Sequence, residues 1–165
     1  MNEHSLETLN STACQRQFVR RPTTSRMSNV GVPQNWIPKR VNAVIRFSDP
    51  RQKEGSSEFR QKTHIQQFLD RVANEKWPEV NWIEIHGVSA YNAKKNNLSA
   101  DQQLGLELAR IRDGKGVGEL FIWDDIDRFS SLPVDKSTNE LLDLPRKGVF
   151  AYFCSLHLFL YPFTG

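Results

Sequence analysis

The chain has 165 residues, a formal net charge of +3, 38% hydrophobic residues and 25% charged residues, which suits one domain with its own core. Its two cysteines, Cys14 and Cys154, lie far apart with no CxxC or Cys/His cluster around them, so neither a disulfide framework nor a zinc site is indicated. The most apolar segment, residues 149–163, is shorter than the roughly 20 residues of a membrane span. The N-terminus lacks the apolar stretch of a secretory signal, so we expect a soluble, cytoplasmic protein.

Residues 1–40 are rich in Ser, Thr, Asn, Gln and Pro and contain six cationic but only two acidic side chains. Segments of this composition do not bury enough apolar surface to offset the entropy of ordering. We therefore predict a disordered basic tail over residues 1–40, able at most to make weak electrostatic contact with nucleic acid, and a domain over residues 41–165.

The domain alternates strand and helix patterns. Ile65, Phe68, Leu69 and Val72 have helical spacing, and Ser99 with Gln102 forms a capping box. The expected elements are, in order, a strand at 41–48, a helix containing residues 65–72, a strand at 80–85, a helix opened by Ser99, a strand at 117–123, a helix at 134–146 and a strand at 149–160.

This order predicts an α/β fold, with a mostly parallel central sheet and helices on both faces. Ligand sites in such sheets form at the carboxyl ends of the strands. Arg46 and Ser48 point to the same side at the end of the first strand, Ser89 follows the second, and the third leads into Asp127 and Arg128.

Two chemistries suit these side chains, although ordinary loop polars and strand-end caps would have the same spacing. Arginines beside Ser48 could bind and activate a phosphodiester without a metal. Alternatively, carboxylates at the same edge could hold magnesium for phosphotransfer; they are Asp49, Asp124, Asp125 and Asp127. The histidines fit no triad pattern and there is no G-x-S-x-G elbow, which disfavours acyl hydrolysis.

Four short motifs occur in order along the chain: IRFSDPRQ, GSSEFRQ, HGVSAY and IDRFS. Together they resemble the catalytic domain of the serine recombinases, which are resolvases, invertases and large phage-type integrases. The resemblance covers about residues 41–160. It implies a resolvase-like fold, DNA as the substrate, and dimers or tetramers in the full-length family.

The resemblance also implies a role for each matched residue. Ser48 would attack DNA and become linked to a 5′ phosphate that Arg46 binds, while Arg128 would be a second phosphate-binding arginine and Asp127 an acid or orienting group. Further DNA or phosphate contacts would come from Gln52, Arg60, Gln61, Ser89, Lys94 and Lys95. Neither a nucleotide nor a metal cofactor is implied.

The chain departs from the family at Ser131, where the family places another active-site arginine, and at Val44, where it usually has tyrosine. Lys94 and Lys95 stand in a loop where several members carry arginine. We expect impaired recombination chemistry unless a neighbour such as Lys136 substitutes for the missing arginine. The alternative is an inactive recombinase remnant that acts at most as an interaction module.

The family continues beyond its last strand into a long oligomerisation helix and a separate DNA-binding domain, and residues 41–165 contain neither. We therefore expect a truncated catalytic domain. Without that helix the apolar run at 149–162 would lack its cover, which predicts poor solubility or self-association.

Overall fold

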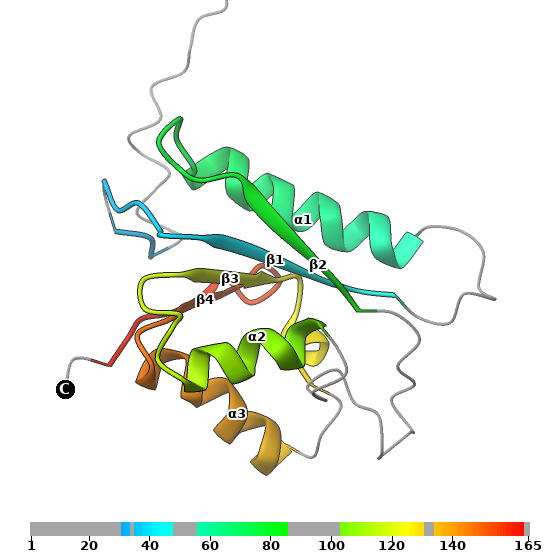
Figure 1. The fold of residues 1–165 in the computed structure, drawn as a ribbon. Coiled ribbons are helices and arrows are strands. Elements are labelled where there is room, and N and C mark those ends of the chain that lie inside the picture. The colour runs from blue at the N-terminus through cyan, green and yellow to red at the C-terminus, as the bar shows by residue number, and fades with distance from the viewer. Residues whose placement is uncertain (1–30, 34, 48–55, 86–102, 131–133, 164–165) are drawn as a thin grey trace, which may run out of the picture.

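The computed structural model describes residues 31–33, 35–47, 56–85, 103–130 and 134–163. Five strands form one sheet in the order β2-β1-β3-β4-β5. The first four are parallel, and β5 is antiparallel to β4 (Figure 1). Their bounds are β1 Val41–Arg46, β2 Val80–Ile85, β3 Leu120–Trp123, β4 Phe150–Phe153 and β5 Leu158–Leu160.

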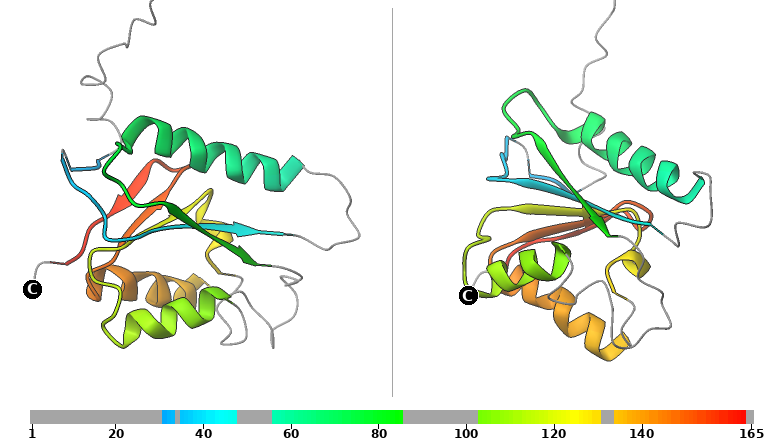
Figure 2. Two further views of the ribbon diagram at one scale, coloured as in Figure 1. Left: turned by 45° about the horizontal axis from the view of Figure 1, so that its top comes forward. Right: turned by 45° about the vertical axis from the view of Figure 1, so that its right-hand side comes forward.

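Three helices cover the sheet. Helix α1 (Ser56–Val72) lies on one face, and α2 (Gln103–Arg112) and α3 (Val134–Arg146) lie on the other (Figures 1 and 2). The mostly parallel α/β fold predicted from the sequence is therefore confirmed, with helices on both faces.

Each face of the sheet has its own apolar core, because successive strand residues point to opposite sides. Under α1, Phe68 stacks on Tyr152 with ring centroids 3.9 Å apart. On the face of α2 and α3, Trp123 stacks on Phe153 at 5.3 Å. Central strands buried on both faces explain why β1 and β3 are nearly continuous apolar runs.

The single strand predicted at 149–160 is wrong: residues 154–157 form a turn between β4 and β5. His157 has a φ of 48°, a left-handed conformation that brings the chain back. The predicted strand at 117–123 is shorter as well, because Gly118 has a φ of 82° and β3 begins only at Leu120. The predicted capping box at Ser99 lies outside the described residues.

The packed part of the chain begins before residue 41, which corrects the predicted boundary of the tail. Val32 is only 5% exposed. Trp36 contacts Phe150 at a ring centroid distance of 4.2 Å and accepts, through its carbonyl, a hydrogen bond from the Trp77 indole at 3.2 Å. These contacts extend the core under α1, so Val32 and Trp36 pack with the domain.

The apolar run at the C-terminus is largely covered. Tyr152, Phe153 and Cys154 are buried and Phe159 nearly so, whereas Leu158 and Tyr161 remain exposed. The self-association expected from this run stays a prediction. Within the described ranges, no helix is long and apolar enough to cross a membrane.

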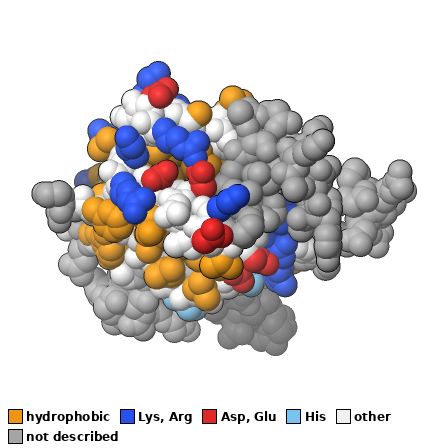
Figure 3. Space-filling view, turned by 90° about the horizontal axis from the view of Figure 1, so that it is seen from below, with side chains coloured by type: hydrophobic (Ala, Val, Ile, Leu, Met, Phe, Trp, Pro, Cys, Tyr) orange, Lys and Arg blue, Asp and Glu red, His pale blue; other side chains and the backbone are white. Residues whose placement is uncertain are grey.

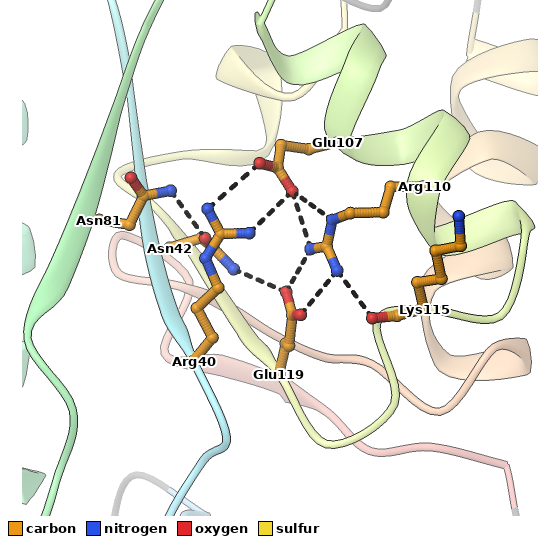
Figure 4. A network of polar contacts seen from close by, with 7 residues as sticks. All are labelled: Arg40, Asn42, Asn81, Glu107, Arg110, Lys115 and Glu119. Carbon is orange, nitrogen blue, oxygen red and sulfur yellow. Dashed lines mark hydrogen bonds and ion pairs between the residues drawn. The ribbon is translucent and has the colours of Figure 1, made fainter.

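A polar network ties α2 to the amino ends of β1 and β3 (Figure 4). Glu119, just before β3, accepts hydrogen bonds from Arg110 at 2.8 and 2.6 Å and from the Asn42 amide at 3.1 Å. Glu107 accepts from both Arg40 and Arg110. This network lies at the opposite end of the strands from the predicted site.

Candidate functional site

The strand order creates a switch point between β1 and β3. The chain leaves β1 toward α1 on one face and leaves β3 toward α3 on the other (Figure 1). In doubly wound sheets, the crevice at the carboxyl ends of two such strands is where ligands bind. Here Arg46 ends β1, and the short 3-10 helix Ile126–Arg128 follows β3.

Arg46 and Arg128 lie close enough for their charges to interact. Burial and the positive charge of Arg128 lower the pKa of Arg46, while Asp127 acts in the opposite direction. The Arg128 Nε lies 3.4 Å from a carboxylate oxygen of Asp127. Two guanidinium charges that interact in partly buried surroundings are suited to binding an anion.

The alternation of side chains along β1 shows on which side of the sheet this arginine pair lies. Val44 belongs to the core on the side of α2 and α3, and Arg46, two residues later, points to the same side. Phe129 anchors the other arginine: it is buried edge-to-face against Trp123 at 5.3 Å, directly after Arg128. Asp125 caps the 3-10 helix by accepting a hydrogen bond from the Ile126 N–H at 2.6 Å.

Gln61 fixes the backbone at the end of β1. From α1, its Oε1 accepts a hydrogen bond from the Arg46 N–H at 3.0 Å, and its Nε2 donates to the Arg46 carbonyl at 2.9 Å. Phe47 donates its N–H to the Ile85 carbonyl at 2.8 Å. The structure thus gives Gln61 a positioning contact just before Ser48, and its predicted contact with phosphate stays a prediction.

Arg60 lies in a different cluster, on the α1 face. Its Nε is 3.7 Å from Asp124, which also accepts a hydrogen bond from the Nδ1 of His64 and is only 2% exposed. Asp124 continues the alternation of Leu120 and Ile122, which belong to the core under α1. The sheet therefore separates Arg60 from the Arg46 and Arg128 pair.

Sequence reasoning missed His64 and the role of Gln61. The signal for His64 was its position four residues after Arg60 on the predicted helix, which places both side chains on one face. The sequence alone could not identify Asp124 as the partner of His64, because Asp125 and Asp127 lie beside it. The bounds of β3 decide which of these carboxylates faces α1.

Several predicted site residues lie outside the described residues. They are Ser48, Gln52, Ser89, Lys94 and Lys95, together with Asp49 of the alternative magnesium site and Ser131.

The aspartates that follow β3 do not converge. Asp124 points to the α1 face, Asp125 caps the 3-10 helix, and Asp127 lies beside Arg128. Across the described part of the chain, no group of three or more His, Cys, Asp or Glu side chains could hold a metal ion. The magnesium alternative therefore receives no support from the arrangement of these three carboxylates.

Comparison with known proteins does not identify the site, so its interpretation rests on the geometry described above. No family model, no curated protein and no solved structure matches the chain.

Proposed function

We propose that the chain is a serine recombinase catalytic domain with a resolvase-like fold, which cleaves and rejoins DNA through a 5′-phosphoserine intermediate at Ser48. The observation that carries this proposal is that Arg46 at the end of β1 and Arg128 just after β3 both lie at the β1/β3 switch point, close enough for their charges to interact. Ser48 follows Arg46 by two residues in the sequence. A serine hydroxyl that came to lie beside two arginines would be suited to attack a phosphodiester.

In the proposed reaction the Ser48 oxygen attacks phosphorus. An Oγ–P bond forms, the P–O3′ bond breaks, and the hydroxyl proton ends on the leaving 3′ oxygen. Arg46 and Arg128 stabilise the negative charge that builds on the phosphoryl oxygens, and Asp127 orients Arg128. The energy of the broken bond is retained in the phosphoserine, so attack by a 3′ hydroxyl of another strand reverses the step. In the family, this exchange takes place between DNA sites held by dimers or tetramers.

The test uses p-nitrophenyl thymidine 5′-phosphate, because it needs no particular DNA site. Attack by Ser48 releases p-nitrophenolate and leaves thymidine 5′-phosphate on the protein. We expect at most one equivalent released per chain, none from Ser48→Ala, and about 100-fold slower release from Arg46→Gln. Ser137→Ala, on the exposed side of α3, is the matched control and should behave as wild type.

Release that is equal in wild type and Ser48→Ala would contradict the proposal. No release from any form would favour the alternative of an inactive remnant that acts as an interaction module, and Ser131 is the sequence feature that points to it.

The Ser131→Arg variant separates these two proposals. A missing donor to the phosphoryl transition state costs on the order of 3 kcal/mol, or about a hundredfold in rate. If the domain is impaired for this reason, restoring arginine should raise the rate of p-nitrophenolate release by about that factor. Ser131→Lys is the control for charge alone and should give a smaller gain. A rate that Ser131→Arg leaves unchanged would show that position 131 does not limit the reaction.

A further inference from the structure

A pocket of about 510 Å³ lies between α1 and the turn that joins β4 to β5. It opens on the α1 face, so the sheet separates it from Arg46 and Arg128. The lining side chains are His64, Gln67, Asp70, Arg71, Cys154, Ser155 and His157. Its volume falls in the range of small-molecule sites.

Helix α1 supplies a row of hydrogen-bond donors to this pocket. His64, Gln67 and Arg71 recur at helical spacing and share one face. The Arg71 Nε donates to the Gln67 carbonyl at 3.2 Å, which orients the guanidinium group. Arg71 lines the pocket together with Cys154 of the turn.

His64 is held with one ring nitrogen toward the pocket side. Its Nδ1 bonds to the buried Asp124, which leaves Nε2 on the opposite side of the ring. Across the pocket, the Nδ1 of His157 lies 3.4 Å from the Tyr152 hydroxyl, so its Nε2 also points away from its protein partner.

Groups that would repel an anion are few in this lining. Asp70 is its acidic member, and one of its oxygens accepts a hydrogen bond from Gln66 at 2.8 Å. The Cys154 thiol stays neutral because its pKa is raised to about 12. Burial is the main cause, and the negative charge of Asp124 adds to it. Ser155 adds a hydroxyl donor at the rim.

We infer that this pocket binds a small phosphate monoester, with the phosphate between Arg71, Gln67 and the Nε2 of His64. Donors from several directions suit a tetrahedral oxyanion, and the guanidinium group supplies charge-assisted bonds. The lining comes only from α1 and one turn, so the pocket has room for one small ester rather than for a length of nucleic acid backbone. This second site does not depend on the proposed recombinase chemistry.

The experiment follows phosphate binding through the ring resonances of His64 in the NMR spectrum of the full chain. The Arg46→Gln variant serves as the background, so that phosphate bound by the arginine pair does not contribute. Inorganic phosphate and glucose 6-phosphate should both shift these resonances in a saturable way, and glucose should not. Arg71→Gln should weaken binding about tenfold or more, because a charged hydrogen bond is lost.

Two further variants control for charge and geometry. Arg71→Lys keeps the charge and should give an intermediate affinity. Arg146→Gln, a half-exposed arginine on α3, removes the same charge elsewhere and should leave binding unchanged. Circular dichroism checks that each variant is folded.

Three outcomes would overturn the inference. The first is that phosphate causes no saturable shift of the His64 resonances. The second is that Arg71→Gln and Arg146→Gln weaken phosphate binding equally. The third is that a short DNA strand displaces phosphate from the His64 site more effectively than glucose 6-phosphate does. Release of p-nitrophenolate by Ser48 in the wild-type chain is scored separately, so either proposal can fail without the other.

Discussion

Gln61 shows how one buried side chain sets the geometry of the candidate active site. Its amide bonds to both the N–H and the carbonyl of Arg46, as a neighbouring strand would. A carboxamide is the side-chain group that offers a donor and an acceptor together. The end of β1 is thereby held to α1 immediately before Ser48.

The Gln61→Leu variant should be markedly less stable than wild type. Leucine keeps the approximate volume but leaves the Arg46 N–H and carbonyl without their partner, at a cost of about 2 to 4 kcal/mol. Urea unfolding followed by tryptophan fluorescence measures this loss. Gln66→Leu, on the exposed side of the same helix, should cost less than about 0.5 kcal/mol. Equal losses for the two variants would contradict the role assigned to Gln61.

Cys154 and Tyr152 make the folded state sensitive to alkaline pH. Burial raises the pKa of Cys154 from 9.0 to about 12 and that of Tyr152 from 10.0 to about 12. Above pH 9 the unfolded chain therefore loses protons that the folded chain retains, so stability falls as pH rises. The stability contributed by these two protonated groups should be fully present below pH 9 and should decline progressively up to about pH 12.

The Cys154→Ala variant tests the share of the thiol in this decline. Its free energy of unfolding should depend less on pH between 9 and 12 than that of wild type, in urea titrations at fixed temperature. A pH dependence identical to that of wild type would show that the thiol does not carry the effect.

At the scale of the elements, partly buried ion pairs fix where α2 packs. Arg110 on α2 bonds to Glu119 before β3, and Glu119 also bonds to Asn42 of β1 (Figure 4). These hydrogen bonds with Glu119, and then those with Glu107, raise the pKa of Arg110 despite burial. Helix α2 precedes β3, so this anchor helps to set the strand that positions Asp127 and Arg128.

The Glu119→Gln variant should lose about 2 kcal/mol of stability, because charged hydrogen bonds to Arg110 are lost. The amide keeps the shape of the carboxylate, and Arg110 keeps Glu107 as its remaining counterion. Glu140→Gln breaks the more exposed pair with Arg112 and should cost at most about 1 kcal/mol. Thermal unfolding of both variants compares them directly. A loss for Glu119→Gln no larger than that for Glu140→Gln would contradict this account of the network.

Sequence patterns predicted those elements whose periodicity is strong and whose ends carry clear signals. The helix over residues 134–146 and the strand over 80–85 have the predicted bounds. The hairpin of β4 and β5 was missed because the turn between them, residues 154–157, contains none of the Gly, Pro, Asn or Asp residues that usually mark a turn, and its left-handed residue is His157. The early packing of Val32 and Trp36 was missed because two apolar residues in a polar segment have no period.

At the scale of the molecule, the sheet divides the polar residues of its carboxyl edge into two sites. The sequence predicted that Arg46, Asp124, Asp127 and Arg128 would meet at that edge, which follows from parallel strands alone. It could not predict which face each would take, because this depends on where β3 ends and the 3-10 helix begins. The arginine pair belongs to the α2 and α3 side, and the Asp124 cluster to the α1 side.

The face of α2 and α3 carries mixed charge beside apolar side chains (Figure 3). Exposed pairs such as Arg112 with Glu140 and Arg146 with Asp143 bring opposite charges together there. On this face the described residues form no surface of a single charge sign, so the proposed function relies on the arginine pair rather than on a broad basic patch here.

The most direct test of the central claim is to locate the covalent thymidylyl group after incubation with p-nitrophenyl thymidine 5′-phosphate. Peptide mapping by mass spectrometry identifies the residue that carries it. We predict that it is Ser48, and that Arg46→Gln and Arg128→Gln each lower the yield at early times. A group carried by another residue, or yields at Ser48 that neither arginine variant changes, would contradict the account.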